Sequence, residues 1–123
     1  MKPGEAIKAL FDGWEKSDPD AIADLFTSDG IYEDPLQPKH LVGPDEIRQG
    51  CGAGIAAITD CQIKTLHFLE SLELGFAEGF FASKDVTSGE RFDFSFALLV
   101  EMREGKIARL AEYFDTKPLI PQG

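Results

Sequence analysis

Residues 91–102, RFDFSFALLVEM, carry the most regular side-chain pattern in the chain. Every second side chain is large and apolar, and this set is Phe92, Phe94, Phe96, Leu98, Val100 and Met102. The positions between them include Arg91, Asp93, Ser95 and Glu101. Side chains that alternate with a period of two lie on opposite faces of a strand. The pattern therefore predicts a long strand with one buried face.

Three more long strands are predicted in this half of the chain, over about 62–74, 76–87 and 106–116. Turn sequences separate the strands: the weaker LELG at 72–75, TSGE at 87–90 and REGK at 103–106. Strands joined by tight turns pair with their neighbours in antiparallel fashion. We therefore expect a mostly antiparallel sheet.

The N-terminal segment follows the helical period instead. In AIKALFDGW the large apolar residues recur at i, i+3, i+4 and i+7, which defines one face of an amphipathic helix. These residues are Ile7, Leu10, Phe11 and Trp14. The face they form should pack against the sheet.

Two further helices are predicted. The first covers SDPDAIADLFTSDG, where Asp18 can cap the first turn, Pro19 suits the first helical position and Gly30 ends the helix. Its apolar face carries Ile22, Leu25 and Phe26, and the short strand IYEDP follows it. The second covers GPDEIRQGCGAGIAAI and begins through Pro44. Its three glycines each weaken a helix by about 0.5–1 kcal/mol, so we expect a loose middle.

Helices followed by strands, with no repeat or linker, predict one α+β domain over residues 1–123. A chain of this length buries roughly two-thirds of its unfolded surface, which is enough for a core. The three N-terminal helices would cover the concave face of a curved, mostly antiparallel sheet.

The charge and the apolar content exclude several classes of protein. The chain has 12 basic and 22 acidic residues, a formal net charge of −10, which repels nucleic acids and anionic membranes. No apolar run approaches the roughly 18 residues of a membrane span, and the N-terminus lacks the pattern of a secretory signal. We therefore expect a cytoplasmic protein with neither nucleic acid nor membrane as partner.

The cysteines and histidines show no metal-ligand spacing. Cys51 and Cys61 lie ten residues apart without a CxxC pattern, which favours reduced thiols over a disulfide or a metal site. His40 falls in a predicted loop and His67 in a predicted strand, so both are expected to be structural or exposed. The sequence predicts neither a metal nor a cofactor.

The stretch YEDP places two polar groups on one face of a predicted strand. Tyr32 and Asp34 are two positions apart and share that face, whereas Glu33 points the other way. Near the end of the last strand, Glu112 shares its face with Leu110 and Phe114 by the same rule. Asp115 belongs to the opposite face unless a bulge intervenes.

A carboxyl group enclosed by Trp14, Phe94 and Phe96 would lose hydration. Its pKa would rise toward the range that is useful for proton transfer near neutral pH. Two such carboxyls that face one another can divide the roles of acid and base. The YEDP context favours a pocket-facing Asp34 over a simple turn residue before Pro35, and Glu112 is also compatible with a solvated edge or a dimer interface.

The order of these segments resembles the SnoaL-like, ketosteroid-isomerase-like branch of the nuclear transport factor 2 superfamily over about residues 6–117. The resemblance rests on ALFDGW, DAIADLFTSDG, IYEDP, the helix entered through GPDEI, and four strands ending in EGKIARLAEYFD. It implies an α+β cone around a deep apolar pocket, the cystatin-type roll. The superfamily includes isomerases, polyketide cyclases, epoxide hydrolases and members without a known reaction.

The resemblance assigns chemistry to particular positions. In the isomerase pattern the general base matches Asp34, but the two oxyanion donors fall at Leu10 and Leu98, which cannot donate hydrogen bonds. In the epoxide-hydrolase pattern Tyr32 and Asp34 position water and Glu112 replaces a catalytic Asp. Its remaining Arg and Asp partners fall at Gly79 and Phe81. The cyclase pattern needs only an acid near the end of the last strand, either Glu112 or Asp115.

These observations leave two classes of function. One is an enzyme that moves a proton on a hydrophobic small molecule without a cofactor, an isomerase-like or cyclase-like reaction. Its expected catalytic residues are Asp34, Tyr32, Glu112 and Asp115, and its expected ligand contacts are Trp14, Phe94, Phe96, Leu98 and Phe114. The alternative is a ligand carrier or sensor on the same fold. Strand faces outside the pocket, such as the side with Arg91, Asp93 and Ser95, suggest a homodimer.

Overall fold

The protein is described by a computed structural model over residues 1–116, in which three helices and six strands form. The helices are α1 (Pro3–Glu15), α2 (Pro19–Ala23) and α3 (Gly43–Ala56). The strands are β1 (Phe26–Glu33), β2 (Leu41–Val42), β3 (Ile58–Glu70), β4 (Leu74–Asp85), β5 (Phe94–Arg103) and β6 (Lys106–Phe114). Residues 117–123, which include KPL of the TKPL segment, lie outside the described residues.

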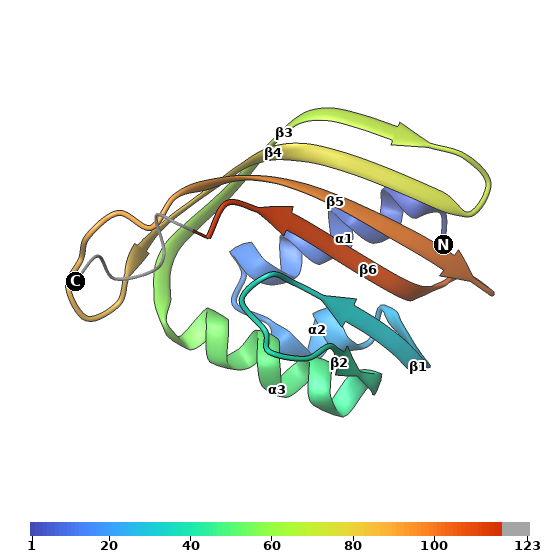
Figure 1. Ribbon diagram of the computed structural model, residues 1–123, viewed down its shortest axis with the longest axis horizontal. Helices are drawn as coiled ribbons and strands as arrows, with labels where there is room; N and C mark the ends of the chain where they lie inside the picture. Colours follow the sequence, from blue (N-terminus) through green and yellow to red (C-terminus); the bar gives the residue numbers. More distant parts are fainter. Residues whose placement is uncertain (117–123) are drawn as a thin grey trace.

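The strands form one sheet in the order β2-β1-β6-β5-β4-β3 (Figure 1). All neighbouring pairs are antiparallel except β1 and β6, which are parallel. The tight turn between β5 and β6 has positive φ angles at Glu104 (52°) and Gly105 (77°), which suits a two-residue hairpin turn. The mostly antiparallel sheet predicted from the turn sequences is confirmed.

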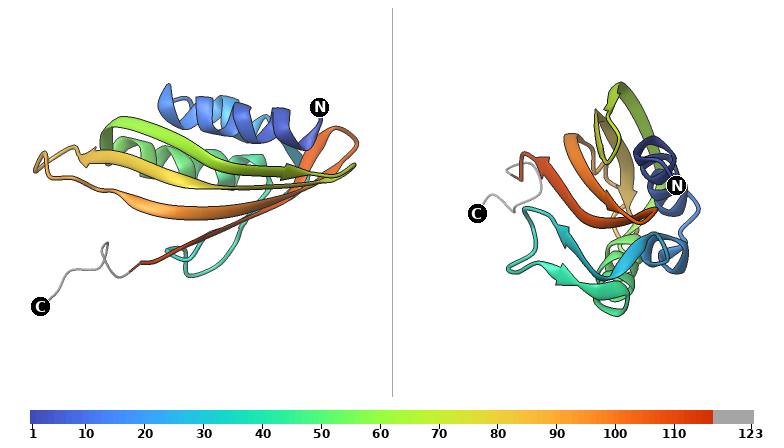
Figure 2. Two further views of the ribbon diagram at one scale, coloured as in Figure 1. Left: turned by 90° about the horizontal axis from the view of Figure 1, so that it is seen from above. Right: turned by 90° about the vertical axis from the view of Figure 1, so that its right-hand side faces the viewer.

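The helices form a layer on one side of the curved sheet, as the two views of Figure 2 show. The predicted α+β class, with three N-terminal helices against the concave face, is confirmed. Within residues 1–116, no helix is long and apolar enough to cross a bilayer.

The second helix is much shorter than the sequence predicts. It ends at Ala23, and residues from Phe26 onward belong to β1 instead. The backbone of this segment pairs with β6, and the Ile107 N–H donates to the Leu25 carbonyl at 2.8 Å. Gly30 does not end a helix: a Cβ there would lie 3.0 Å from both the Ile107 carbonyl and Phe26, so glycine permits a close approach inside the strand.

The third helix runs continuously through its glycines, with the start predicted at Gly43. Two of these glycines lie where neighbouring side chains pack closely on the helix. A Cβ at Gly50 would lie 2.5 Å from Leu41, and one at Gly54 would lie 3.1 Å from Trp14. The small residues that weaken the helix in isolation therefore let α1 and β2 approach it.

Several predicted strand bounds are wrong by a few residues. β3 ends at Glu70 instead of 74, and β4 covers Leu74–Asp85 instead of 76–87. β3 begins at Ile58, because a bulge around Asp60 (φ 55°) lets pairing with β4 resume beyond it. β5 begins only at Phe94, because the Asp93 carboxylate accepts the Ser83 N–H at 3.1 Å and replaces a ladder bond. β6 ends at Phe114 instead of 116.

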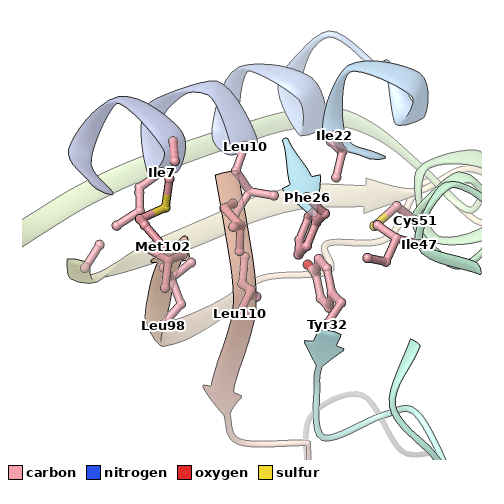
Figure 3. Packing of buried hydrophobic residues seen from close by; sticks show 14 of the residues in the cluster. Ile7, Leu10, Ile22, Phe26, Tyr32, Ile47, Cys51, Leu98, Met102 and Leu110 are labelled. Atoms are coloured by element: carbon pink, nitrogen blue, oxygen red, sulfur yellow. The ribbon is translucent and has the colours of Figure 1, made fainter. Parts of the chain in front are cut away.

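The core lies between the helix layer and the sheet (Figure 3). Its fully buried side chains include Leu10 from α1, Ile22 from α2, Phe26 from β1, Ile47 from α3 and Leu110 from β6. The alternating face predicted for β5 is confirmed. Four of its members are buried, Phe96, Leu98, Val100 and Met102, whereas Phe92 and Phe94 are partly exposed to the cavity described next.

Candidate functional site

A cavity of about 300 Å³ lies between the helices and the concave face of the sheet. The five expected ligand contacts all line it: Trp14, Phe94, Phe96, Leu98 and Phe114. Tyr32, Asp34 and Glu112 line it as well. Asp115, the fourth expected catalytic residue, does not: it follows the last residue of β6 and is exposed.

Tyr32 and Glu112 meet because their strands are parallel neighbours. The register pairs Tyr32 with Leu110, which places Glu112 two residues further along β6 on the same face. The Tyr32 hydroxyl donates a hydrogen bond to Glu112 Oε1. The two residues are 80 positions apart in the sequence, so the pair exists only in the folded chain.

The opposite face of the same two strands carries an ion pair. Arg109 Nε and Nη2 donate to the two carboxylate oxygens of Glu33 at 3.1 and 3.0 Å. His40 lies 3.5 Å from Glu33 on this side, and the Arg109 contact lowers the pKa of Glu33. Glu33 thus points away from the cavity, as strand alternation predicts.

Glu112 is the carboxyl group that the site perturbs most. Burial raises its pKa from 4.5 to about 7, the Tyr32 hydrogen bond opposes this shift, and the negative charge of Asp34 adds to it. Near neutral pH the group therefore exists in both protonation states. A raised pKa of an acid also means that its contribution to stability is full below pH 4.5 and is lost as the pH rises through about 7.

Two of the ionisable groups beside Glu112, Tyr32 and Cys51, hold their protons. Burial and the neighbouring Glu112 charge raise the pKa of Tyr32 well above its usual value. Burial raises the pKa of Cys51, which also lines the cavity, to about 12. Cys51 and Cys61 are both free, as the sequence predicts, but Cys51 is not a thiolate nucleophile at neutral pH.

Asp34 is both a turn residue and part of the cavity wall. Its Oδ1 accepts hydrogen bonds from the backbone N–H groups of Leu36 at 2.7 Å and Gln37 at 3.2 Å, the pattern of an Asx turn. It is partly buried one residue beyond β1. The turn therefore fixes the direction of a carboxylate at the rim of the cavity.

The positions that would complete the chemistry of known relatives supply only carbon atoms. Leu10 and Leu98, where an isomerase would keep its oxyanion donors, are buried in the cavity wall. Phe81 also lines the cavity, and Gly79 is pressed against the backbone of β3. The donors and acids that the resemblance would place at these positions are therefore replaced by apolar side chains and a glycine.

Aromatic rings form a large part of the wall. Phe94 stacks between Phe81 and Phe114, with ring centroids 4.7 and 4.5 Å apart, and Trp14 meets Phe81 edge to face at 6.0 Å. Phe81 and Cys51 are contacts that the sequence reasoning missed. Two signals point to them: Phe81 lies directly across from Phe94 in the sheet, and Cys51 lies one helical turn after the buried Ile47.

Among residues 1–116, no group of three or more histidine, cysteine or acidic side chains is arranged to hold a metal ion. His40 and His67 are both exposed, as expected, and His67 Nδ1 lies 2.6 Å from Glu78 Oε1. Neither histidine lines the cavity.

Residues 7–110 match the family model of the SnoaL-like domain. Because this match covers most of the chain, the protein belongs to the SnoaL-like family. The resemblance noted from the order of its segments is thereby confirmed. No curated protein matches the chain.

Solved structures with the same fold have low sequence identity. A hypothetical protein with a ketosteroid isomerase-like fold from Catenulispora acidiphila DSM 44928, in complex with trimethylamine, is 20% identical with a TM-score of 0.82, covering 94% of this chain and 88% of that one. A protein named as a SnoaL-like polyketide cyclase from Jannaschia sp. CCS1 is 11% identical with a TM-score of 0.83, covering 95% and 88%. An epoxide hydrolase/cyclase-like enzyme of pyran ring formation in the polyether salinomycin is 18% identical with a TM-score of 0.79, covering 92% and 90%.

Proposed function

We propose that this protein binds a hydrophobic small molecule in the cavity and catalyses a proton transfer on it without a cofactor, in an isomerase-like or cyclase-like reaction. Glu112 donates or accepts the proton, and the Tyr32 hydroxyl holds its carboxyl group in place. Asp34 supplies a second carboxyl group, which lies at the rim of the cavity. The role first expected for Asp34 thus passes in part to Glu112.

The observation that carries the proposal is the hydrogen-bonded pair of Tyr32 and Glu112 on the wall of an apolar cavity. General acid–base catalysis is most effective when the pKa of the group lies near the working pH. The pKa of Glu112, about 7, meets that condition. Asp34 and Glu112 also differ in environment, which is how one site separates the roles of two carboxyls.

The apolar wall supports the choice of ligand. Pockets for small molecules are mostly lined by apolar and aromatic groups with a few polar groups that orient the ligand. The cavity has this composition, with Trp14, Phe81 and Phe94 among its walls. The relatives named above include proteins described as a polyketide cyclase and a cyclase-like enzyme of polyether formation, which favours substrates of similar hydrophobicity.

A second candidate is a carrier or sensor that binds the same class of ligand without turnover. The feature that favours it is the replacement of the isomerase donor positions by Leu10 and Leu98, which leaves a developing oxyanion unsupported there. Both candidates require the cavity to accept a hydrophobic molecule, and they differ only in turnover.

The test is a turnover screen with hydrophobic ketones, lactones and aromatic polyketides, followed by a pH profile. We expect kcat to change with an inflection near pH 7: a rise with pH identifies Glu112 as the base, and a fall identifies it as the acid. Asp34→Asn should lower the rate without moving this inflection far. A flat profile between about pH 5 and pH 9, or binding without turnover across the screen, contradicts the enzymatic proposal.

We also propose that two copies pair through the sheet face opposite the helices. Large apolar side chains are exposed on this face, among them Phe80 (48%), which lies across from Ser95, and Tyr113 (59%). Light scattering should give about twice the chain mass of 13.5 kDa, and Phe80→Lys should return it to one chain. A wild-type mass of one chain contradicts this pairing.

The free thiols Cys51 and Cys61 favour a reducing compartment such as the cytoplasm.

A further inference from the structure

We propose that the cavity binds a hydrophobic amine in its protonated, ammonium form. This inference rests on the small-molecule site proposed above and specifies the charge of its ligand. It follows from the charges, the hydrogen-bonding groups and the aromatic rings that line the cavity.

The charged groups around the cavity all have one sign. Among the described residues that line it, Asp34, Asp85 and Glu112 carry carboxyl groups, whereas none is a lysine, an arginine or a histidine. A ligand with a carboxylate or a phosphate would lose its hydration beside these groups without gaining a positive partner. An ammonium group would gain a partner of opposite charge. The formal net charge of −10 adds a field that favours cations near the surface.

The carboxyl groups of the cavity wall only accept hydrogen bonds when they are ionised. The Tyr32 hydroxyl uses its only hydrogen in the hydrogen bond that it donates to Glu112. Asp34 and Asp85 each use Oδ1 to accept two backbone N–H groups of their own turns, and a carboxylate has two oxygens to offer. The other polar side chains of the wall, those of Trp14, Gln37 and Cys51, can donate hydrogen bonds but carry no positive charge. A ligand that brings donors can therefore satisfy these carboxylate oxygens, and an ammonium group brings both donors and charge.

The aromatic rings of the wall suit the same group. Cations are attracted to the faces of aromatic rings, and the attraction grows when water is excluded. The cavity is lined by Phe11, Trp14, Phe81, Phe92, Phe94 and Phe114. These rings can also bury the hydrocarbon part of an amine. The same aromatic side chains would therefore contact both the ammonium group and the hydrocarbon part of the ligand.

Ammonium binding should be coupled to the ionisation of Glu112. The groups that face this carboxyl are Tyr32 from β1, Asp34 beyond it and Cys51 from α3. The cavity-lining residues of α1 and β5 carry no titratable group: Leu10, Phe11, Trp14, Phe94, Phe96 and Leu98. Cys51, with a pKa of about 12, keeps its proton through the neutral range. A bound cation favours ionised Glu112, so the affinity should rise as the pH passes through about 7.

The experiment compares three probes of one shape: 2-phenylethylammonium, 2-phenylethanol and phenylacetate. Trp14 is the only tryptophan of the chain and lines the cavity, so its fluorescence reports binding directly. At pH 8 we expect the ammonium probe to bind about 10-fold more tightly than the alcohol, and phenylacetate to bind most weakly. Between pH 8 and pH 5.5 the ammonium affinity should fall by about 10- to 30-fold, the limit for a ligand that needs one group with a pKa of about 7 ionised. The affinity of the alcohol should change little.

Two variants test whether Glu112 causes the preference for the ammonium probe and its pH dependence. Glu112→Gln should remove the pH dependence and most of the preference for the ammonium probe while it keeps the affinity for the alcohol. Glu73→Gln, the same change at an exposed position between β3 and β4, should behave as wild type. If the alcohol or phenylacetate binds as tightly as the ammonium probe at pH 8, the ammonium assignment is wrong and the small-molecule site remains. If none of the three binds, the ammonium assignment and the proposed site both fall.

Discussion

Glu112→Gln is expected to lower the turnover of a substrate of this site by about 10²–10⁴-fold, the usual contribution of a general acid or base. Glutamine has the shape of glutamic acid and can still accept the Tyr32 hydrogen bond, but it cannot exchange a proton near pH 7. For a neutral substrate the loss should appear in kcat, because the apolar wall that binds it is unchanged. The measurement is steady-state kinetics on the best substrate of the screen.

The same variant should become more stable than wild type at high pH. Ionising Glu112 in the folded protein is unfavourable by about 3 kcal/mol, since its pKa rises from 4.5 to about 7. Glutamine avoids this cost, so the stability advantage of the variant should grow from pH 5 to pH 8 in urea unfolding. Undiminished kcat rules out the catalytic role, and a variant that loses both activity and stability at pH 8 shows a structural role instead.

Gly79→Ala is expected to destabilise the protein by about 3 kcal/mol, at the upper end of the usual cost of overpacking. A Cβ at Gly79 would lie 1.9 Å from the carbonyl oxygen of Lys64 and 3.0 Å from Thr65 Cα. These are backbone atoms of the neighbouring strand, which cannot move as a flexible side chain can. The register of β3 and β4 shifts between Thr65 and His67, so the close contact lies where the sheet is irregular.

The matched control is Gly52→Ala in α3. A Cβ there would meet only Pro19, at 3.8 Å, an ordinary contact. Because alanine favours a helix over glycine, this variant should gain about 0.5–1 kcal/mol. If local packing determines the effect, urea unfolding should show a lower free energy of unfolding for Gly79→Ala and a higher one for Gly52→Ala. A Gly79→Ala variant as stable as wild type would show that the two strands can separate at low cost.

Much of the fold could be predicted from local patterns. The alternation in residues 91–102 depends only on neighbours in sequence, and it correctly gives the face of Phe96, Leu98, Val100 and Met102. The start of β1 could not be predicted in the same way. Ile22, Leu25 and Phe26 have helical spacing, but Phe26 pairs with Ile107 of β6, and this distant contact decides the conformation.

The candidate site could likewise be predicted only where it depends on local patterns. Strand alternation predicts that Tyr32 and Asp34 share one face and that Glu112 lies with Phe114, and these residues all line the cavity. The sequence does not rank the two carboxyls, because their burial depends on the turn after β1 and on the pairing of β1 with β6. That pairing brings Glu112 to Tyr32, and burial beside it raises the pKa of Glu112.

The 80-residue separation of Tyr32 and Glu112 has a consequence for how the chain folds. Contacts between distant segments form late, because closing a long loop costs entropy before the contact repays it. Until β6 docks beside β1, Glu112 is an ordinary glutamate with a pKa near 4.5, and afterwards its pKa is about 7. At pH 6 the chain should therefore take up a proton from water when these strands pair. A pH-indicator dye in weakly buffered solution can measure when this uptake occurs, and hence when the site forms.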